Sequence, residues 1–584
     1  MNSETRTCQN CKKDFTIEPE DFNFYEKIKV PPPTFCSECR LVRRLNFRNE
    51  RTLYKRQCDK CKKDIFSAYN SDSIFKIYCH NCWWGDKWDP MDFGTDYDFN
   101  RPFFEQFQLF SKEIPLISLF TSGNQINSDY CNFTANNKDS YLCFGGKDNE
   151  RISYSNRTSL SKDSVDIYNG TGLELCYESV QCEKSYRLFF CRQCENCSDS
   201  VFLYDCRNCQ NCFGCTNLRN KSYCIWNEQY SRDEYLKKIE EFNIGNSQNL
   251  ENLKLQFFDL YRKSIHKYAH LINSPSSTGD YLFNTKNCKD CFDLSGAGSE
   301  NSKYTHYAVL GVKDSYDNYG MPTAERVYET IAIGFDSIEN SNYYFSYFIR
   351  GSNEIYYSYN CVSSHNLFAC IGLRNKSYCI LNKQYTKEQY EELMPKIIKH
   401  MNDMPYIDSK GRIYKYGEFF PLELSPFSYN ETIAQEYFPL TKIEAEKQGY
   451  KWKEREERNY QIDIQTENIP DNITELKEDI IGKVIECEHK GTCNEQCTEA
   501  FKIIPSELQF YQRMNLPIPH LCPNCRHYQR LKQRNPLKLW HRQCMCEKKH
   551  ANHAGKCKIE FETSYAPDRP EIIFCERCYQ QEVY

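Results

Sequence analysis

The cysteines between Cys131 and Cys224 share one reading frame of three, and this period constrains the fold of the 584-residue chain more than any other feature. All twelve fall in that frame, and of its 32 positions only Lys221 is charged. Most of the others are Cys, Ser, Thr, Gly, Asn, Ile or Leu. An α-helix repeats every 3.6 residues and a simple strand every 2, so neither explains the period. The frame therefore faces a narrow core.

A β-solenoid whose coils have about 12 residues, four of them pointing inward, has the observed period. Residues 194–203 would then lie over residues 206–215, and the large side chains would point outward. In coil geometry alone this resembles the 12-residue β-helix of certain insect antifreeze proteins. Those proteins bridge their cysteines, whereas here we expect free thiols that pack as small hydrophobic groups. A ladder of metal ions along the bore is the alternative.

A second copy follows the first. The segment Leu218-Arg-Asn-Lys-Ser-Tyr-Cys recurs from Leu373 as Leu-Arg-Asn-Lys-Ser-Tyr-Cys. Its frame is broken upstream, and we expect an insertion around residues 316–325. Each copy ends in a capping box, at residues 231–234 and 386–389, that begins a helix covering the last coil. A longer amphipathic helix is expected at about residues 250–271. The sequence thus predicts a mainly β fold of two tandem narrow solenoids with capping helices.

The N-terminal end carries two consecutive CxxC…CxxC sets. Zn²⁺ prefers four soft ligands in a tetrahedron, and a CxxC turn supplies two sulfurs from one knuckle. The sets predict two structural zinc sites with the ligands Cys8, Cys11, Cys36 and Cys39, and Cys58, Cys61, Cys79 and Cys82.

The C-terminal end repeats this pattern, because the Phe, Ile, Pro and Phe-Tyr positions of residues 15–25 reappear in residues 501–511. The chain is thus expected to bind about four zinc ions. Cys544 is the alternative to Cys546, His550 and His553 lie in an inserted loop nearby, and Cys487 and His489 have no assigned role. The predicted ligands of these two further zinc-ribbon or treble-clef modules are Cys493, Cys497, Cys522 and Cys525, and Cys546, Cys557, Cys575 and Cys578.

A basic, helix-like segment follows the second cysteine pair of the first and third sets. Arginines three or four positions apart share a helix face, and such a face suits contact with phosphates. The competing interpretation is that these side chains neutralise the zinc thiolates or cover an acidic surface. The candidate nucleic-acid contacts are Arg40, Arg43, Arg44, Arg48, Arg526, Arg530, Lys532 and Arg534.

The net charge of −5 gives no whole-chain argument for nucleic acid or membrane. The N-terminus is polar, and no stretch reaches the roughly 18 apolar residues of a membrane span, so we expect no membrane association. Reduced thiols then indicate a cytoplasmic, reducing compartment. No P-loop, dinucleotide-binding fingerprint or hydrolase motif occurs, so we expect no enzymatic activity.

With these motifs, the chain resembles a family of cysteine-rich zinc-ribbon and treble-clef proteins found in candidate-phylum bacteria and giant viruses. The resemblance extends over nearly the whole chain. It implies zinc binding, and no activity is established for the family. The matching stretches begin at Phe35 (FCSECR), Tyr78 (YCHNCWW), Asp98 (DFNRPFFEQF), Phe213 (FGCTNLRNK) and Tyr429 (YNET).

The expected organisation has seven parts. A double zinc module (1–90) and a linker helix (91–123) precede the first solenoid (124–230). Capping and connecting helices (231–275) lead to the second solenoid (276–385), which is followed by a capping helix and mixed linker (386–480) and a second double zinc module (481–584). Two functions remain open: a non-catalytic zinc-binding scaffold that binds RNA or DNA through its basic helices, and a protein-interaction or particle-structural scaffold whose partners dock on the solenoid faces.

Overall fold

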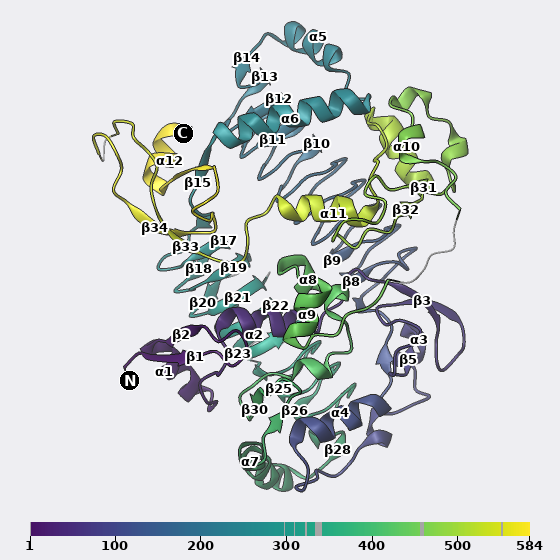
Figure 1. The fold of residues 1–584 in the computed structure, drawn as a ribbon, viewed down its shortest axis with the longest axis vertical. Helices are drawn as coiled ribbons and strands as arrows, with labels where there is room; N and C mark the ends of the chain where they lie inside the picture. The colour runs from purple at the N-terminus through teal and green to yellow at the C-terminus, as the bar shows by residue number, and fades with distance from the viewer. Residues whose placement is uncertain are drawn as a thin grey trace.

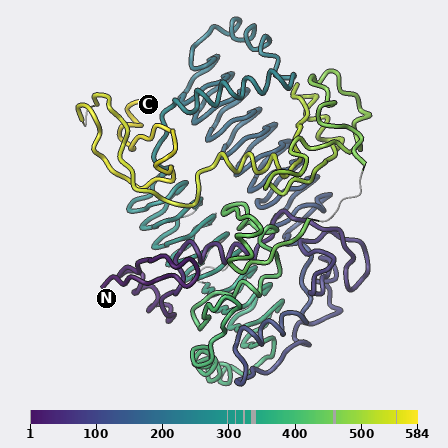
Figure 2. The backbone as a smooth tube through the Cα atoms, viewed as in Figure 1, coloured from purple at the N-terminus to yellow at the C-terminus, as the bar shows by residue number. Residues whose placement is uncertain are grey.

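The computed structural model describes residues 2–584 except 297, 309, 322–323, 333–340, 456–460 and 551–552. It is rich in parallel sheet, which forms two stacks of short strands joined by helices and small modules (Figures 1 and 2). The first stack, residues 121–225, contains β7 (Thr121–Ser122), β8 (Asn132–Ala135), β9 (Phe144–Lys147), β10 (Tyr186–Phe189), β11 (Ser198–Tyr204), β12 (Gln210–Thr216) and β13 (Ser222–Ile225).

Pairing in the first stack begins with a thirteen-residue step from β7 to β8 and advances by twelve residues at each later step. Ser198 pairs with Gln210, and Gln210 pairs with Ser222. Between the named strands, isolated parallel bridges such as Glu150 to Lys162 continue the same column. The step equals the coil length expected from the cysteine frame.

The period of three has its origin in the backbone conformation. From Phe133 to Trp226 every third residue has a positive φ near 50°, as at Asp139 (51°) and Asn208 (52°). The next residue belongs to the buried frame, and the one after it forms parallel bridges to residues twelve positions away. Left-handed backbone is least costly for Gly, Asn and Asp, which explains why these residues recur at the third position.

Serine and cysteine suit the interior because their side chains form hydrogen bonds with backbone N–H and C=O groups that strand pairing does not use. Ser185 Oγ accepts the N–H of Cys197 at 3.2 Å, and in the second stack Ser358 Oγ accepts the N–H of Cys370 at 2.9 Å. The thiols donate in turn, as from Cys206 Sγ to a carbonyl oxygen 3.5 Å away. Every cysteine of the chain is a free thiol. The interior is thus a hydrogen-bonded filling of small side chains.

The second stack, residues 271–380, is less regular. Its steps are twelve residues from Tyr343 onward, but fourteen from Phe292 to His306 and sixteen from Val327 to Tyr343. The parallel strands are β16 (Leu271–Ile272), β17 (Gly279–Phe283), β18 (Thr285–Lys286), β19 (Cys291–Leu294), β20 (Ser299–Glu300), β21 (Lys303–Ala308), β22 (Val312–Met321), β23 (Ala324–Ile331), β24 (Tyr343–Tyr344), β25 (Asn353–Tyr356), β26 (His365–Phe368) and β27 (Ser377–Ile380).

The insertion expected around residues 316–325 is wrong for the described part of that segment. Val312 pairs with Ala324 and Tyr316 with Tyr328, which are ordinary twelve-residue steps. Residues 322–323 lie outside the described residues. The additional residues fall instead in three longer steps, of fourteen residues from β19 to β21, thirteen from β21 to β22 and sixteen from β23 to β24.

Both capping boxes are confirmed. Ser231 and Thr386 are the N-caps of α5 (Arg232–Phe242) and α7 (Lys387–Asp403), and each accepts the backbone N–H three residues later. The helices contact β13 and β27, the last parallel strands of their stacks. The connecting helix α6 (Ser247–Lys263) is shorter than expected. Residues after it form β15 (Ile265–Lys267), which pairs with β35 (Ile572–Phe574) near the C-terminus.

The linker helix α4 (Phe103–Glu113) packs its aromatic side chains on the second stack. The ring of Phe103 lies 5.1 Å from Tyr357, and Phe107 lies 5.1 Å from Phe420. These rings belong to a buried cluster that also contains side chains of the first 50 residues. The N-terminal module is therefore part of the same core as the second stack.

Candidate metal centres and their anchoring helices

Four sets of four thiols converge, with all sulfurs of a set within 4.8 Å of one another. Cys11 and Cys36 sulfurs are 3.8 Å apart, and those of Cys522 and Cys525 are 3.5 Å apart. A tetrahedron with Zn–S bonds of about 2.3 Å has edges of about 3.8 Å, so the spacing suits a metal of that size. The sets are Cys8, Cys11, Cys36 and Cys39; Cys58, Cys61, Cys79 and Cys82; Cys487, Cys497, Cys522 and Cys525; and Cys544, Cys557, Cys575 and Cys578.

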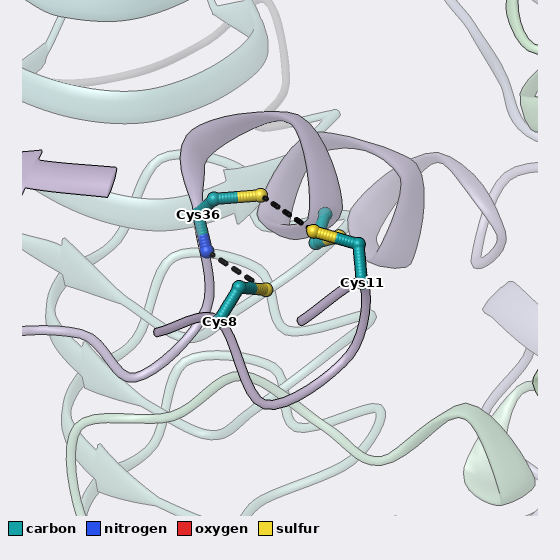
Figure 3. A group of neighbouring side chains, drawn as sticks. Cys8, Cys11 and Cys36 are labelled. Atoms are coloured by element: carbon teal, nitrogen blue, oxygen red, sulfur yellow. Dashed lines mark hydrogen bonds between the residues drawn. The ribbon is translucent and has the colours of Figure 1, made fainter. Parts of the chain in front are cut away.

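All four sets are built in the same way. In the first, Cys8 follows the end of β1 (Glu4–Thr7), and Cys36 is the N-cap of α2 (Ser37–Leu45). The backbone N–H of Cys36 donates to Cys8 Sγ at 3.3 Å, and the sulfurs of Cys11 and Cys36 point toward one another (Figure 3). The corresponding N–H···S contacts measure 3.2 Å from Cys79 to Cys58, from Cys522 to Cys487 and from Cys575 to Cys544.

This shared geometry corrects two expected ligands. Cys487, which had no assigned role, takes the place expected for Cys493 in the third set, and Cys544 takes the place of Cys546 in the fourth. The missed signal is position: each first thiol directly follows a short strand. These strands are β1, β3 (Tyr54–Gln57), β31 (Ile485–Glu486) and β33 (Trp540–Gln543).

Cys493 stays close to the third set, since its sulfur lies 3.7 Å from that of Cys525. His489 lies outside the set, with its Nδ1 3.4 Å from a carboxylate oxygen of Glu495.

In the first two sets the surroundings favour the thiolate, the form that binds metals, at Cys8 and Cys58, whereas burial and the neighbouring thiols raise the pKa of Cys39 and Cys82. Burial by itself raises the pKa of Cys58, but the backbone N–H groups of Cys61 and Cys79 stabilise the thiolate and bring the pKa down to about 7. The pKa of Cys8 is also lowered, chiefly by hydrogen bonds from the thiols of Cys36 and Cys39. The N-terminal end of the helix that begins after the third cysteine adds a positive partial charge.

The basic helix α2 points its arginines into the molecule. Arg40 Nη2 lies 2.8 Å from Asp317, and Arg44 Nη1 lies 2.8 Å from Glu329 and 3.3 Å from Asp317. Arg43 also contacts Glu329, at 2.8 Å. Figure 1 shows α2 beside β22 and β23, which carry these carboxylates. All five side chains are at most 2% exposed.

The helix α11 (Pro523–Lys532) makes the same contacts with the first stack. Arg526 Nε lies 3.2 Å from Asp166, and Arg530 Nη1 lies 2.8 Å from Asp166 and 3.1 Å from Glu178. Both arginines are fully buried or nearly so. The N-terminal module is therefore anchored on the second stack and the C-terminal module on the first.

The structure turns the arginines proposed as phosphate contacts toward carboxylates inside the molecule. Arg40, Arg43, Arg44, Arg48, Arg526 and Arg530 are at most 4% exposed. Arg48 pairs with Glu50 at 2.7 Å, and Arg534 donates to the hydroxyl of Tyr168 at 3.0 Å. Of the eight candidates only Lys532 has a mostly exposed side chain, and it pairs with Glu495. The buried guanidiniums would have to leave their carboxylates before they could reach a nucleic acid.

Sequence reasoning missed the four carboxylates that receive the arginines. Asp166 and Glu178 are twelve positions apart, as are Asp317 and Glu329, and all four occupy the left-handed position of the triplet. Two acids in one column of successive coils would have been a detectable signal. Only the stacking of coils, however, shows that they form one acidic site.

A polar cleft of about 600 Å³ lies between the two stacks and the C-terminal helix α12 (Glu576–Val583). Its charged groups largely pair with one another, as Arg207 does with Glu195 at 3.5 Å and Arg219 with Asp205 at 3.3 Å. Gln193 also lines it and is 3% exposed, and its Oε1 has no hydrogen-bond partner within the described part of the chain. The cleft therefore offers unpaired amide oxygens in a nearly balanced charge environment.

No family model and no curated protein matches the chain. Within the described residues, none of the helices combines the length and the apolar character that crossing a bilayer requires.

Proposed function

We propose that the chain is a non-catalytic scaffold in which zinc-bound treble-clef modules hold two β-solenoids together. The observation that supports this most directly is the pair of buried arginine helices. Each begins at a tetrathiol set and ends in the acid pair of a parallel stack. A metal that fixes the start of such a helix also fixes the arginines that anchor it.

The solenoid interpretation is supported by the twelve-residue step that the first stack keeps from β8 to β13. Columns of bridges twelve residues apart recur at four positions in each repeat, for example through Glu150, Ser153, Asn156 and Ser159. Between these columns lie the buried Cys, Ser and Leu positions. A coil of four short sides around a narrow interior accounts for both facts.

Zinc is the metal that best suits four thiols within tetrahedral distance, since soft thiolate sets favour zinc over hard cations. Each set of four cysteines would hold one ion, and that ion would stabilise the fold rather than take part in a reaction. Elemental analysis of the purified chain tests this, and a chelator should lower its thermal stability. A chain that keeps its stability without bound metal would contradict a structural role.

Among the two open functions, the burial of the basic helices favours a scaffold for protein partners over one that binds RNA or DNA. A salt titration of binding to generic RNA and DNA distinguishes them. We expect no salt-dependent binding to either nucleic acid. The buried arginines cannot reach phosphates, so they cannot release the counterions that make such binding weaken as salt is added. Lys532→Glu, an exposed charge reversal, should leave this result unchanged. A steep salt dependence would instead revive the nucleic-acid function.

The polar cleft supports a second candidate function, which is binding of an uncharged, hydroxyl-rich molecule such as a short oligosaccharide. The unpaired Oε1 of Gln193 can accept a hydroxyl hydrogen, and aromatic residues such as Tyr281 and Tyr584 also line the cleft. Thermal shifts with a panel of neutral oligosaccharides test this idea. Stabilisation that Gln193→Leu abolishes would support it, and no shift with any member would remove it.

A further inference from the structure

Two histidines between the first and second cysteines of the last tetrathiol set lie against the sulfurs of Cys546 and Cys578. His550 Nε2 lies 3.1 Å from Cys546 Sγ, and His553 Nε2 lies 3.1 Å from Cys578 Sγ. The four ligand atoms of these residues lie within 4.8 Å of one another. Cys578 also belongs to the tetrathiol set with Cys544, so the two groups share one sulfur.

The histidines are held in the orientation that a metal ligand needs. His553 Nδ1 lies 2.7 Å from the carbonyl oxygen of Gly555, so this nitrogen carries the proton and donates it. The lone pair of Nε2 is then free on the side of Cys578. Backbone hydrogen bonds run in both directions between His550 and His553, at 2.9 and 3.3 Å, and fix the two residues opposite one another. A backbone acceptor on the second ring nitrogen is typical of metal-binding histidines.

We propose that the C-terminal module binds two metal ions, with Cys578 as a thiolate that bridges them. This inference rests on the proposed function, since the first ion is that of the tetrathiol set. The second ion takes Cys546, His550, His553 and the shared sulfur. A tetrahedral site with Zn–S bonds of about 2.3 Å and Zn–N bonds of about 2.0 Å has S···N edges of about 3.5 Å, so an ion would move each nitrogen about 0.4 Å away from its sulfur, from the observed 3.1 Å.

Charge supports the second ion. Five cysteines gather in this module, and because a metal binds them as thiolates, a single divalent cation would leave a net charge of −3. A second divalent cation reduces it to −1, with the two histidines neutral. Glu582 is the competing partner of His550, at 3.4 Å, but it already pairs with Lys548. The two-ion site also gives a role to both Cys544 and Cys546, which the sequence offered as alternatives, since each binds a different ion.

Native mass spectrometry of the full chain tests the proposal because it counts ions per folded molecule. We expect five zinc ions in the unmodified chain, four in the double variant His550→Ala/His553→Ala, and four in Cys546→Ser. Cys578→Ser should lose two ions because its sulfur is shared. His541→Ala is the matched control, since the His541 ring is exposed and pairs with Glu560 and Glu562 on the neighbouring strand.

Four ions in the unmodified chain, with no loss in the histidine variant, would overturn the second site and leave the proposed function intact. A chain with no bound metal at all would overturn both. If Cys578→Ser does not fold, cobalt substitution of the unmodified chain decides: a thiolate-bridged Co²⁺ pair has coupled spins, so its EPR signal should be weaker than the signal of the histidine variant. Equal signals per bound ion would also overturn the bridge.

Discussion

The two anchoring helices, α2 and α11, occupy equivalent places in the two halves of the molecule. A comparison of their contacts shows which ones the two halves share and which ones differ. Arg40 and Arg44 of α2 correspond to Arg526 and Arg530 of α11 by their spacing from the cysteine pair. Each pair of arginines meets two acids twelve positions apart on the stack below. The neighbours have diverged: α2 carries a third buried arginine, Arg43, where α11 has glutamine.

The preceding helices diverge in the same way. In the N-terminal half, Asp21 of α1 (Pro19–Lys27) pairs with Lys303 of the second stack at 2.9 Å. In the C-terminal half, Glu507 of α10 (Pro505–Met514) meets the first stack through a neutral partner, since it accepts the hydroxyl hydrogen of Tyr154 at 2.8 Å, and it also contacts Arg526 at 3.3 Å. The contact that both halves keep is the arginine-to-acid-pair anchor, which therefore defines how a module docks.

Loss of a metal ligand should have the largest effect, and it compares the two halves directly. Cys8→Ser and Cys487→Ser should each release one zinc ion and destabilise their half by several kcal/mol, since structural zinc contributes about 10–16 kcal/mol of binding free energy. Cys493→Ser should retain the full zinc content. Elemental analysis with thermal unfolding measures both. Loss of an ion from Cys493→Ser, with none from Cys487→Ser, would restore the ligand set expected from sequence.

Removal of one anchoring arginine should come next, at about 3–5 kcal/mol, because it leaves buried carboxylates without a partner. We expect Arg530→Met to cost more than Arg44→Met. In the N-terminal half Arg40 and Arg43 still contact Asp317 and Glu329, whereas in the C-terminal half only Arg526 remains for the acid pair.

Denaturant unfolding measures this difference. Lys532→Met, on the same helix but exposed, is the matched control and should change stability by no more than about 0.5 kcal/mol. Asp166→Asn added to Arg530→Met should recover part of the loss. Equal effects of the arginine and lysine variants would show that the acid pairs do not anchor the modules.

The interior serines offer a smaller comparison between the two stacks. Ser185→Ala and Ser358→Ala each leave one buried backbone N–H without its acceptor, which costs about 1–3 kcal/mol. The two losses should be similar despite the irregular steps of the second stack. Chemical unfolding of both variants checks this, with Ser409→Ala, in an exposed turn, as the control.

Much of the architecture could be predicted because it repeats along the chain. The triplet frame, the twelve-residue step and the capping boxes are local patterns, and each is visible within a few tens of residues. The tetrathiol sets were predictable to the extent that CxxC pairs mark them. Cys487 was missed because its partner is not three residues away, and the close CxxxC of Cys493 and Cys497 resembled a knuckle more strongly.

The docking of the modules could not be predicted, because it depends on faces that meet only after folding. Arg40 and Asp317 are 277 positions apart, and a basic helix is equally typical of a surface that binds phosphate. What decides between the two is whether an acidic column lies opposite. That column becomes visible only when Asp317 and Glu329 are placed on adjacent coils.

The smallest expected effect concerns Tyr437 of α8 (Ile433–Tyr437), which lies between the two halves. Its hydroxyl is 3.2 Å from that of Tyr168 in the first stack and 3.4 Å from that of Tyr319 in the second. Arg534 and Arg157 lie against its ring, at 4.6 and 5.4 Å. Tyr437→Phe keeps the ring and removes both hydroxyl contacts, so we expect a loss of about 0.5–1.5 kcal/mol in unfolding free energy. If the two stacks unfold as one unit in the variant, its single unfolding transition should shift as a whole. If the variant instead unfolds in two transitions, the hydroxyl of Tyr437 couples the two halves.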